Sequence, residues 1–156
     1  MKTAIVVFSK TGITKSLAER AADALRAKGH DVDLFLLKTD PPMEGDKAPQ
    51  KFEIVNAPDL TAYEAVLVGG PVWAFSPNPV TKRYMESVML SGKKFMPFTT
   101  MGFPLRCLGG NRTLRVMSRL ARKAGADVIK GIAVPKMLRD HEKLMAEAVD
   151  FIADNL

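Results

Sequence analysis

A segment rich in hydroxyl groups follows the first apolar run of the chain. It reads Ser9-Lys10-Thr11-Gly12-Ile13-Thr14 and precedes a stretch with helical spacing. Backbone N–H groups at a helix start, with hydroxyl donors beside them, form a cradle for a phosphate. An ordinary capped turn explains the same residues, because Ser and Thr also cap helices. The segment lacks GxxxxGK[ST] and GxGxxG, which argues against nucleotide triphosphatases and dinucleotide-binding proteins.

Two later segments carry aromatic side chains. Gly70 to Pro77 holds the only tryptophan, Trp73, and is stiffened by prolines. An aromatic ring exposed on such a loop suits stacking on a planar ligand, whereas packing into the core is the alternative. The segment Thr99 to Gly110 mixes apolar and polar groups and could form the opposite wall of a flat slot. It also holds Cys107 beside Arg106. A structural or incidental role of the Cys107 thiol is favoured over a reactive one.

Apolar strands alternate with helices along the chain. The predicted strands are Ala4–Phe8, Asp31–Leu37, Ala65–Gly70, Phe95–Met101 and Val128–Val134. The predicted helices are Thr14–Lys28, Pro79–Leu90, Asn111–Ala124 and Leu138–Ala153. This alternation predicts an α/β fold with a parallel sheet covered on both faces.

Local signals refine these elements. Thr14 is the predicted N-cap of the first helix, and Asn78 caps the second, with Pro79 at its first position. Prolines at 41, 42, 49 and 58 argue against a full helix in residues 38–62, so a loop with at most a short helical turn is expected there.

In open α/β sheets, ligands bind beyond the carboxyl ends of the strands, where the three segments above would meet. Together, S-x-T-G-x-T at 9–14, GGPVWAFSPNP at 69–79 and TTMGFPLRCLGGNR at 99–112 resemble the flavodoxin family, over nearly the whole chain. The resemblance implies a three-layer, doubly wound, five-stranded sheet of order 2-1-3-4-5. It also implies one FMN, bound non-covalently, in a short-chain form of the fold.

The same resemblance implies roles for individual residues. The ribityl phosphate would be held by Ser9, Thr11, Gly12, Ile13 and Thr14. The second flavin loop would comprise Pro71, Val72, Trp73, Ala74 and Phe75, with Trp73 stacked on one isoalloxazine face. The third would comprise Thr99, Thr100, Met101, Gly102 and Phe103, with backbone from 99–102 at the pyrimidine edge and Phe103 on the other face.

Composition limits the classes of fold and function that the chain can have. The chain has 156 residues, of which 47% are hydrophobic and 26% charged, as expected of one globular domain, here residues 1–156. It has no run of 18 apolar residues, so no membrane span is expected. With one cysteine and two histidines, the chain has too few side chains for an internal disulfide and few for a zinc site or a catalytic triad. A single cysteine is typical of a protein of the reducing cytoplasm. The first and third strands do not end in aspartate, which excludes a response regulator.

Charge is distributed unevenly. Residues 79–143 carry 14 basic and 4 acidic side chains, and the net charge is +6. Four arginines recur at spacings of 3, 4 and 3, which places Arg112, Arg115, Arg119 and Arg122 on one helix face. A plain solvated face is one interpretation. The hypothesis is a surface for an anionic partner, either an acidic redox protein or the phosphates of NADPH; nucleic acid is not expected, since no reading motif accompanies the charge.

The function implied is redox chemistry on the flavin. An electron carrier that docks to redox partner proteins is favoured, because extra segments that would build a nicotinamide or quinone pocket are missing. An NAD(P)H-dependent flavin or quinone reductase is the alternative. A protein that keeps the fold but binds another ligand is the third.

Overall fold

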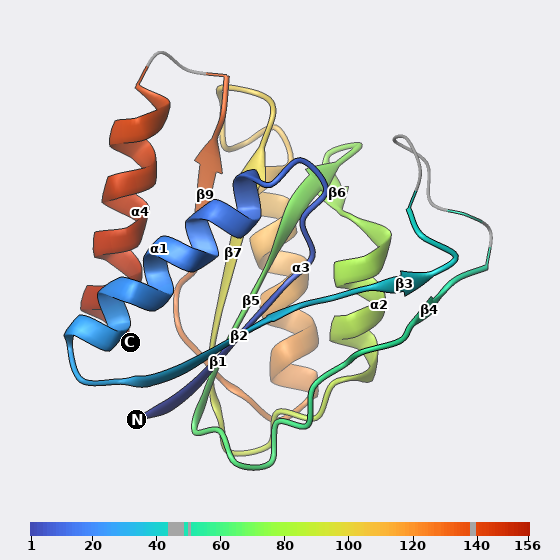
Figure 1. The fold of residues 1–156 in the computed structure, drawn as a ribbon. Helices are drawn as coiled ribbons and strands as arrows, with labels where there is room; N and C mark the ends of the chain where they lie inside the picture. Colours follow the sequence, from blue (N-terminus) through green and yellow to red (C-terminus); the bar gives the residue numbers. More distant parts are fainter. Residues whose placement is uncertain (44–48, 50, 138–139) are drawn as a thin grey trace.

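The main strands of the chain form one parallel sheet, shown in Figure 1. The computed structural model describes residues 1–43, 49, 51–137 and 140–156. The main strands are β1 (Lys2–Val7), β2 (Asp31–Leu36), β5 (Ala65–Trp73) and β7 (Lys94–Met101), followed by β8 (Asp127–Val128) and β9 (Ile132–Pro135). The order is β2-β1-β5-β7, with β8 and β9 both parallel to β7. The predicted order 2-1-3-4-5 is therefore confirmed, with β8 and β9 together in place of the fifth strand.

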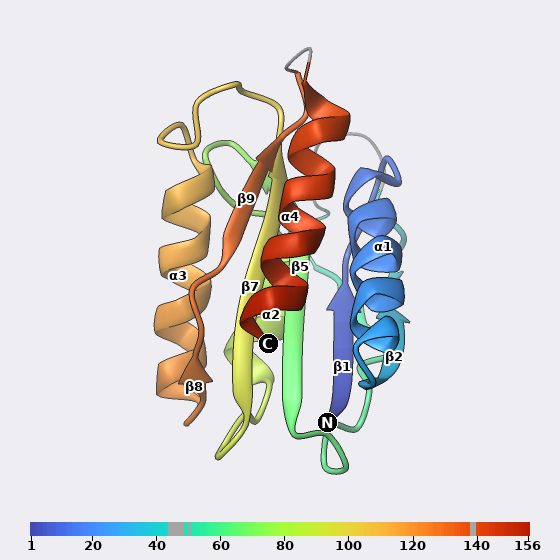
Figure 2. The same cartoon turned by 90° about the vertical axis from the view of Figure 1, so that its left-hand side faces the viewer.

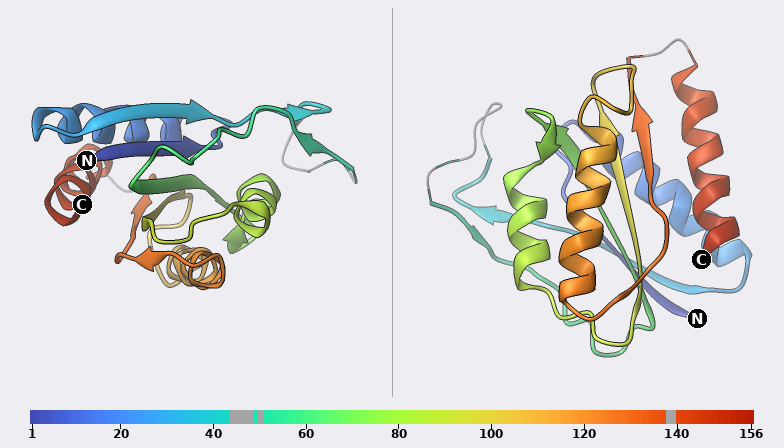
Figure 3. Two further views of the ribbon diagram at one scale, coloured as in Figure 1. Left: turned by 90° about the horizontal axis from the view of Figure 1, so that it is seen from below. Right: turned by 180° about the vertical axis from the view of Figure 1, so that it is seen from behind.

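Two helices cover each face of the sheet. These are α1 (Ile13–Ala27) and α4 (His141–Asn155) on one face, and α2 (Pro79–Ser87) and α3 (Gly110–Lys123) on the other (Figures 2 and 3). The start predicted for the last helix, at residues 138–139, lies outside the described residues. No helix in the described part of the chain has the length and apolar character needed to cross a membrane.

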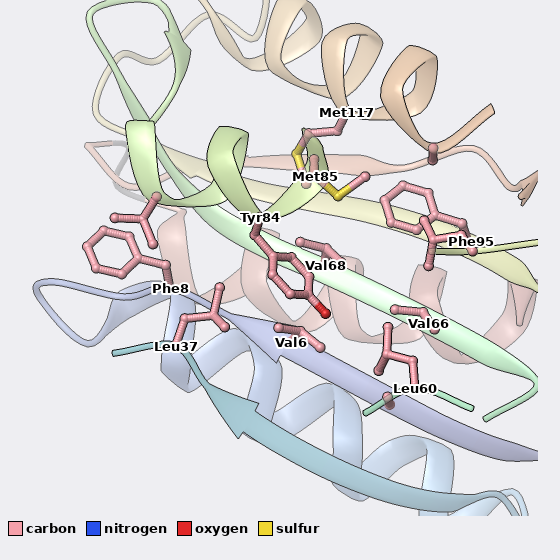
Figure 4. Close-up of a cluster of buried hydrophobic side chains, with 14 of the residues drawn as sticks. Val6, Phe8, Leu37, Leu60, Val66, Val68, Tyr84, Met85, Phe95 and Met117 are labelled. Carbon is pink, nitrogen blue, oxygen red and sulfur yellow. The ribbon is translucent and has the colours of Figure 1, made fainter. Parts of the chain in front are cut away.

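Alternate residues of the buried strands build two apolar clusters, because successive side chains of a strand point to opposite faces. Ile5 packs in the cluster under α1 and α4. Val6 and Val68 pack with Tyr84 and Met117 in the cluster under α2 and α3 (Figure 4). A sheet buried on both faces requires such continuous apolar strands, as the sequence predicted.

The two helix starts differ from each other. Asn78 caps α2 as predicted: its side chain accepts a hydrogen bond from the Thr81 N–H at 2.9 Å, and Pro79 is the first helical residue. The prediction that Thr14 caps α1 is wrong. Gly12 is the N-cap, with φ of 88° and no side-chain cap, and Thr14 is turned inward. A left-handed residue at this position suits glycine.

The fifth strand is interrupted, whereas one continuous strand was predicted. Phe95 on β7 accepts a hydrogen bond from the Ile129 N–H at 2.7 Å, so Pro97, two residues on, faces the same neighbour without an N–H to donate. Gly131 passes so close to Pro97 that a Cβ there would lie 2.2 Å from the Pro97 carbonyl oxygen. The missing donor therefore separates β8 from β9.

Residues 38–62 contain a short antiparallel pair, which the prediction of a loop with a helical turn missed. β3 (Thr39–Asp40) pairs with β4 (Glu53–Ile54). The Asn56 side chain extends this pairing: it accepts from the Lys38 N–H and donates to the Leu36 carbonyl, each at 2.7 Å. The described residues of this segment contain no helix, and the prolines lie outside the paired residues and so leave the two strands intact.

Candidate functional site

The three segments predicted to form a site meet around one pocket at the carboxyl edge of the sheet. Its volume is about 170 Å³. The lining residues are Lys10, Thr11, Thr14, Pro71, Val72, Trp73, Thr100, Met101, Gly102 and Lys136. Each predicted loop thus contributes, as parallel topology requires of segments that follow neighbouring strands.

The first segment presents the start of α1 to this pocket. The Ser9 hydroxyl accepts hydrogen bonds from the N–H groups of Gly12 and Lys15, at 3.2 and 3.3 Å. The N–H groups of Ile13 and Thr14 have no partner within the described residues. Two free N–H groups at a helix start form a place for an anion, and the helix dipole adds to the attraction.

A pair of hydroxyls joins the first and third segments. Thr14 Oγ1 and Thr100 Oγ1 are 2.7 Å apart, and both residues are buried. Only one of the two hydrogens lies between them, so the accepting hydroxyl keeps its own proton for a further hydrogen bond. This pair fixes where the start of α1 sits relative to the end of β7.

Trp73 lies at the end of a hairpin rather than in a loop. β5 continues past Gly70, where its end was predicted, and turns back through Ala74 and Phe75 into β6 (Ser76–Pro77). Both turn residues have positive φ, 49° and 62°, as in a type I′ turn. The half-buried Trp73 ring meets Phe8 edge to face, with centroids 5.9 Å apart, and it also lines the pocket. The ring thus packs partly on the core, and because it also lines the pocket, its stacking on a planar ligand stays a prediction.

Phe103 does not line the pocket that Trp73 lines, although the resemblance implied that it would cover the second face of the flavin ring. Its ring stacks on Phe75, with centroids 5.2 Å apart and planes 21° from parallel. Neither ring lines the pocket, and the exposed fractions are 47% for Phe75 and 50% for Phe103. The two rings thus form an apolar pair on the surface.

Several predicted residues support the pocket without lining it. The fully buried Thr99 donates its hydroxyl to the Gly70 carbonyl at 2.6 Å and so ties β7 to β5. Ser9, Gly12 and Ile13 shape the start of α1, while Ala74 forms the turn after Trp73. The hydroxyls of Ser9 and Thr99 thus fix the segments on which the pocket residues lie.

Two lysines at the pocket were not predicted as ligand-binding residues. Lys10 lies within the first segment, and its Nζ is 5.7 Å from the centroid of the Trp73 ring. Lys136 directly follows β9, and its N–H donates to the Met101 carbonyl at 2.8 Å. Its position after the last strand was the available signal, since all strand ends of a parallel sheet meet at this edge. The pocket therefore carries two positive charges.

The second and third segments are joined by a close backbone contact. Gly109 has φ of 103°, and a Cβ there would lie only 2.7 Å from the Cα of Phe75. Arg106, in the same segment, donates from Nε to the Ala133 carbonyl at 2.8 Å and anchors the segment to β9. The neighbouring Cys107 is exposed. Among the described residues, no group of three or more His, Cys, Asp or Glu side chains could hold a metal ion.

Comparison with known proteins agrees with this architecture. No curated protein sequence matches the chain. Oxidised Flavodoxin 1 from Bacillus cereus is 18% identical, with a TM-score of 0.71 over 99% of this chain and 96% of that one. A flavodoxin from Streptococcus pneumoniae TIGR4 is 19% identical, with a TM-score of 0.70 over 100% and 97%. A Lactobacillus acidophilus flavoprotein in complex with FMN is 18% identical, with a TM-score of 0.61 over 94% and 97%.

At these identities the solved structures show a shared fold. A family model described as the flavodoxin-like fold matches residues 1–147. This match covers all strands of the parallel sheet and the three segments that meet at the pocket. The chain therefore belongs to the family of proteins with the flavodoxin-like fold.

Proposed function

We propose that residues 1–156 form one FMN-binding domain and that the protein is an electron carrier. The observation that carries this proposal is the pocket, where a helix start, two lysines and a tryptophan face one space. The Lactobacillus acidophilus relative crystallised with FMN has the same fold and supports the choice of cofactor.

The residues present fit the phosphate of FMN. A phosphate dianion needs several hydrogen-bond donors and positive charge in one place. The free N–H groups of Ile13 and Thr14, the hydroxyl of Thr11 and the ammonium of Lys10 provide both. Thr14 and Thr100 add the one hydroxyl proton that their mutual hydrogen bond leaves free.

The remaining residues fit a flat, aromatic ring. Trp73 and Val72 line the pocket, and so do residues 100–102. FMN supplies the electron acceptance and donation, while the protein positions it and sets its electrostatic surroundings. Trp73 and Val72 would exclude water from one side of the ring, and Lys136 would favour a negative charge on it. Phe103 is not assigned to the ring, because it stacks on Phe75.

An electron carrier is favoured over a reductase by the surface next to the pocket. The stacked pair Phe75 and Phe103 is about half exposed and lies on the two loops that contribute to the pocket. Such an apolar surface suits brief contact with a redox partner protein. We place this exchange in the cytoplasm, which the single exposed cysteine fits.

Titration with FMN tests the cofactor assignment. Thr11→Ala should weaken FMN binding by about tenfold or more, because a hydrogen bond to a charged group contributes about 1.5–3 kcal/mol. Ser16→Ala is the matched control, since Ser16 lies within α1 and does not line the pocket. Equal FMN affinities for the two variants would contradict the role of Thr11.

Trp73 supplies an independent optical signal. It is the only tryptophan, so protein fluorescence excited at the indole band has a single source. If Trp73 lies against the flavin, bound FMN should quench most of this emission. Bound FMN with undiminished Trp73 emission would place the flavin elsewhere.

Steady-state assays separate the carrier from the reductase. The FMN-loaded protein should oxidise NADPH no faster than free FMN does, with or without a quinone, and should exchange electrons rapidly with a separate flavin reductase. Rapid NADPH oxidation that depends on a quinone would establish the reductase instead.

A further inference from the structure

A second, larger hollow lies on the edge of the sheet, away from the FMN pocket. It runs between α3 and the edge strands β8 and β9, with Phe151 of α4 on its other side, and has a volume of about 1160 Å³. Figure 2 looks onto this edge, where β9 lies between α3 and α4. We call this hollow the edge groove. It shares no lining residue with the FMN pocket, so its function is a separate question.

The charged side chains that line the edge groove are all cations. They are Arg106, Arg115, Arg119, Arg122 and Lys130, without any aspartate or glutamate. All five are exposed, and none belongs to an ion pair formed among the described residues. Arginines gathered without counter-charges repel one another, so an anionic occupant would be favoured.

Only some of the four arginines predicted to share one face of α3 line the edge groove. Arg115, Arg119 and Arg122 line the edge groove, but Arg112 does not. Lys123, next to Arg122, is exposed and also lies outside the groove. The helix thus carries two sets of basic residues, of which only one faces the groove.

Apolar side chains form the floor of the edge groove. Leu114, Ile129, Ile132 and Phe151 line it, and each is only partly buried. An occupant that covered these side chains would bury apolar surface as well as meet the arginines. A small inorganic anion would leave this floor exposed.

The groove follows the unpaired edge of a sheet. β9 pairs with β7 on one side, and within the described residues no strand pairs with its other side. The Ala133 carbonyl points outward there, since it accepts a hydrogen bond from Arg106 Nε at 2.8 Å. Beyond the Ala133 carbonyl, which Arg106 occupies, an unpaired edge of this kind accommodates an extended peptide.

The spacing of two arginines along α3 matches the spacing of side chains along an extended peptide. Arg115 and Arg119 are four residues apart, a rise of about 6 Å along a helix. Side chains on the same face of an extended peptide, two residues apart, recur about every 6.6 Å. Carboxylates at alternate positions would therefore meet successive arginines, while the residues between them face the apolar floor.

We propose that the edge groove binds an extended, acidic segment of a partner protein in which carboxylate and apolar side chains alternate. The segment lies along β8 and β9, with its carboxylates against Arg115, Arg119 and Arg122 and its apolar side chains on Ile129 and Ile132. Arg106 belongs both to the groove and to the segment 99–110, so one end of a bound partner segment adjoins a loop that contributes to the FMN pocket.

Fluorescence anisotropy with a labelled peptide tests this proposal on the full chain, with and without added FMN. The probe is a short blocked peptide in which glutamate alternates with valine. The comparison peptide has the same composition, with its glutamates in one block. The alternating peptide should bind at least tenfold more tightly than the comparison peptide.

Matched variants locate the site. Arg115→Glu with Arg119→Glu should weaken binding of the alternating peptide at least tenfold. Arg112→Glu with Lys123→Glu makes the same change in net charge on the same helix but outside the groove, and should weaken binding less than threefold. Circular dichroism of the two double variants checks that each of them folds.

Four results would overturn the proposal. They are no binding of the alternating peptide, equal binding of the two peptides, equal weakening by the two variant pairs, and displacement of the peptide by equimolar NADPH or a DNA duplex. The last result would make the groove a site for nucleotides or nucleic acid instead.

Discussion

Thr11 and Thr14 line the same pocket but differ in burial and in their hydrogen bonds. Thr11 is exposed, whereas Thr14 is buried and bonded to Thr100. Thr14→Ala should lower the free energy of unfolding by about 1–3 kcal/mol, because the buried Thr100 hydroxyl loses its partner. Thr11→Ala should change it by less than about 0.5 kcal/mol. Urea unfolding of the FMN-free proteins measures both, and an equal effect of the two substitutions would contradict this account.

Tyr84 and Tyr63 are both buried, yet their hydroxyls differ. Burial raises the pKa of Tyr84, and its hydroxyl has no partner among the described residues; it points between apolar side chains that include Val6 and Val66 (Figure 4). The Tyr63 hydroxyl donates to Asp33, and burial raises its pKa to about 12. An unpaired buried hydroxyl costs free energy, whereas a paired one adds stability.

Replacing each tyrosine by phenylalanine separates these two cases. Tyr84→Phe should leave the protein as stable or raise its free energy of unfolding by about 1 kcal/mol, because the unpaired hydroxyl is removed. Tyr63→Phe should lower it by about 1–2 kcal/mol, because Asp33 loses a donor. Thermal and urea unfolding measure both changes. A loss of stability in Tyr84→Phe as large as in Tyr63→Phe would show that Tyr84 has a partner.

At the level of elements, Gly109 lets the third segment lie against the hairpin that carries Trp73. Gly109→Ala should lower the free energy of unfolding by about 2–3 kcal/mol, because it combines a positive φ with a steric clash against Phe75. Gly29→Ala is the control, since Gly29 has φ of 91° but no atom lies within 4 Å of the place that a Cβ would take. This substitution should lower the free energy of unfolding by only about 1 kcal/mol. Equal costs would mean that the contact with Phe75 contributes nothing.

The elements that sequence reasoning predicted best are those with strong periodicity. Buried strands such as β1 and helices such as α1 are specified by local apolar patterns, and their ends are accurate to a few residues. The break between β8 and β9 was missed, because it depends on Pro97 in the neighbouring strand. The pair β3–β4 was missed because a two-residue strand has no periodicity to detect.

The site was predictable as a set of loops but not as a set of side-chain contacts. Parallel topology brought the three segments together as expected. The stacking of Phe103 on Phe75 and the burial of Thr99 depend on how loops from distant parts of the chain pack. Lys136 was overlooked because its role depends on which strand end it follows.

For the whole molecule, the positive charge on α3 affects any charge placed in the pocket. A unit charge about 10 Å away through water contributes about 0.4 kcal/mol, or about 17 mV for one electron, before screening. Replacing Arg112, Arg115 and Arg119 by glutamate should therefore lower the potential of the second electron of bound FMN by tens of millivolts at low salt. Spectroelectrochemical titration measures this change.

Two controls test whether this shift in potential comes from charge: a titration at high salt and a charge reversal far from the pocket. The shift should shrink markedly at high salt, since exposed charges are screened over about 3 Å at 1 M. Lys94→Glu should leave the potential nearly unchanged, because Lys94 begins β7 and the pocket lies at its other end. A shift that is independent of salt would point to a structural change rather than to charge.

The contact between Gly109 and Phe75 has a kinetic consequence. The two loops are joined at the backbone and again by the stacked rings of Phe75 and Phe103. One loop cannot swing outward while the other stays in place without breaking both contacts. Exchange of a bound cofactor is therefore expected to proceed by one concerted opening of the two loops, with a single rate for both, rather than by their independent fluctuations.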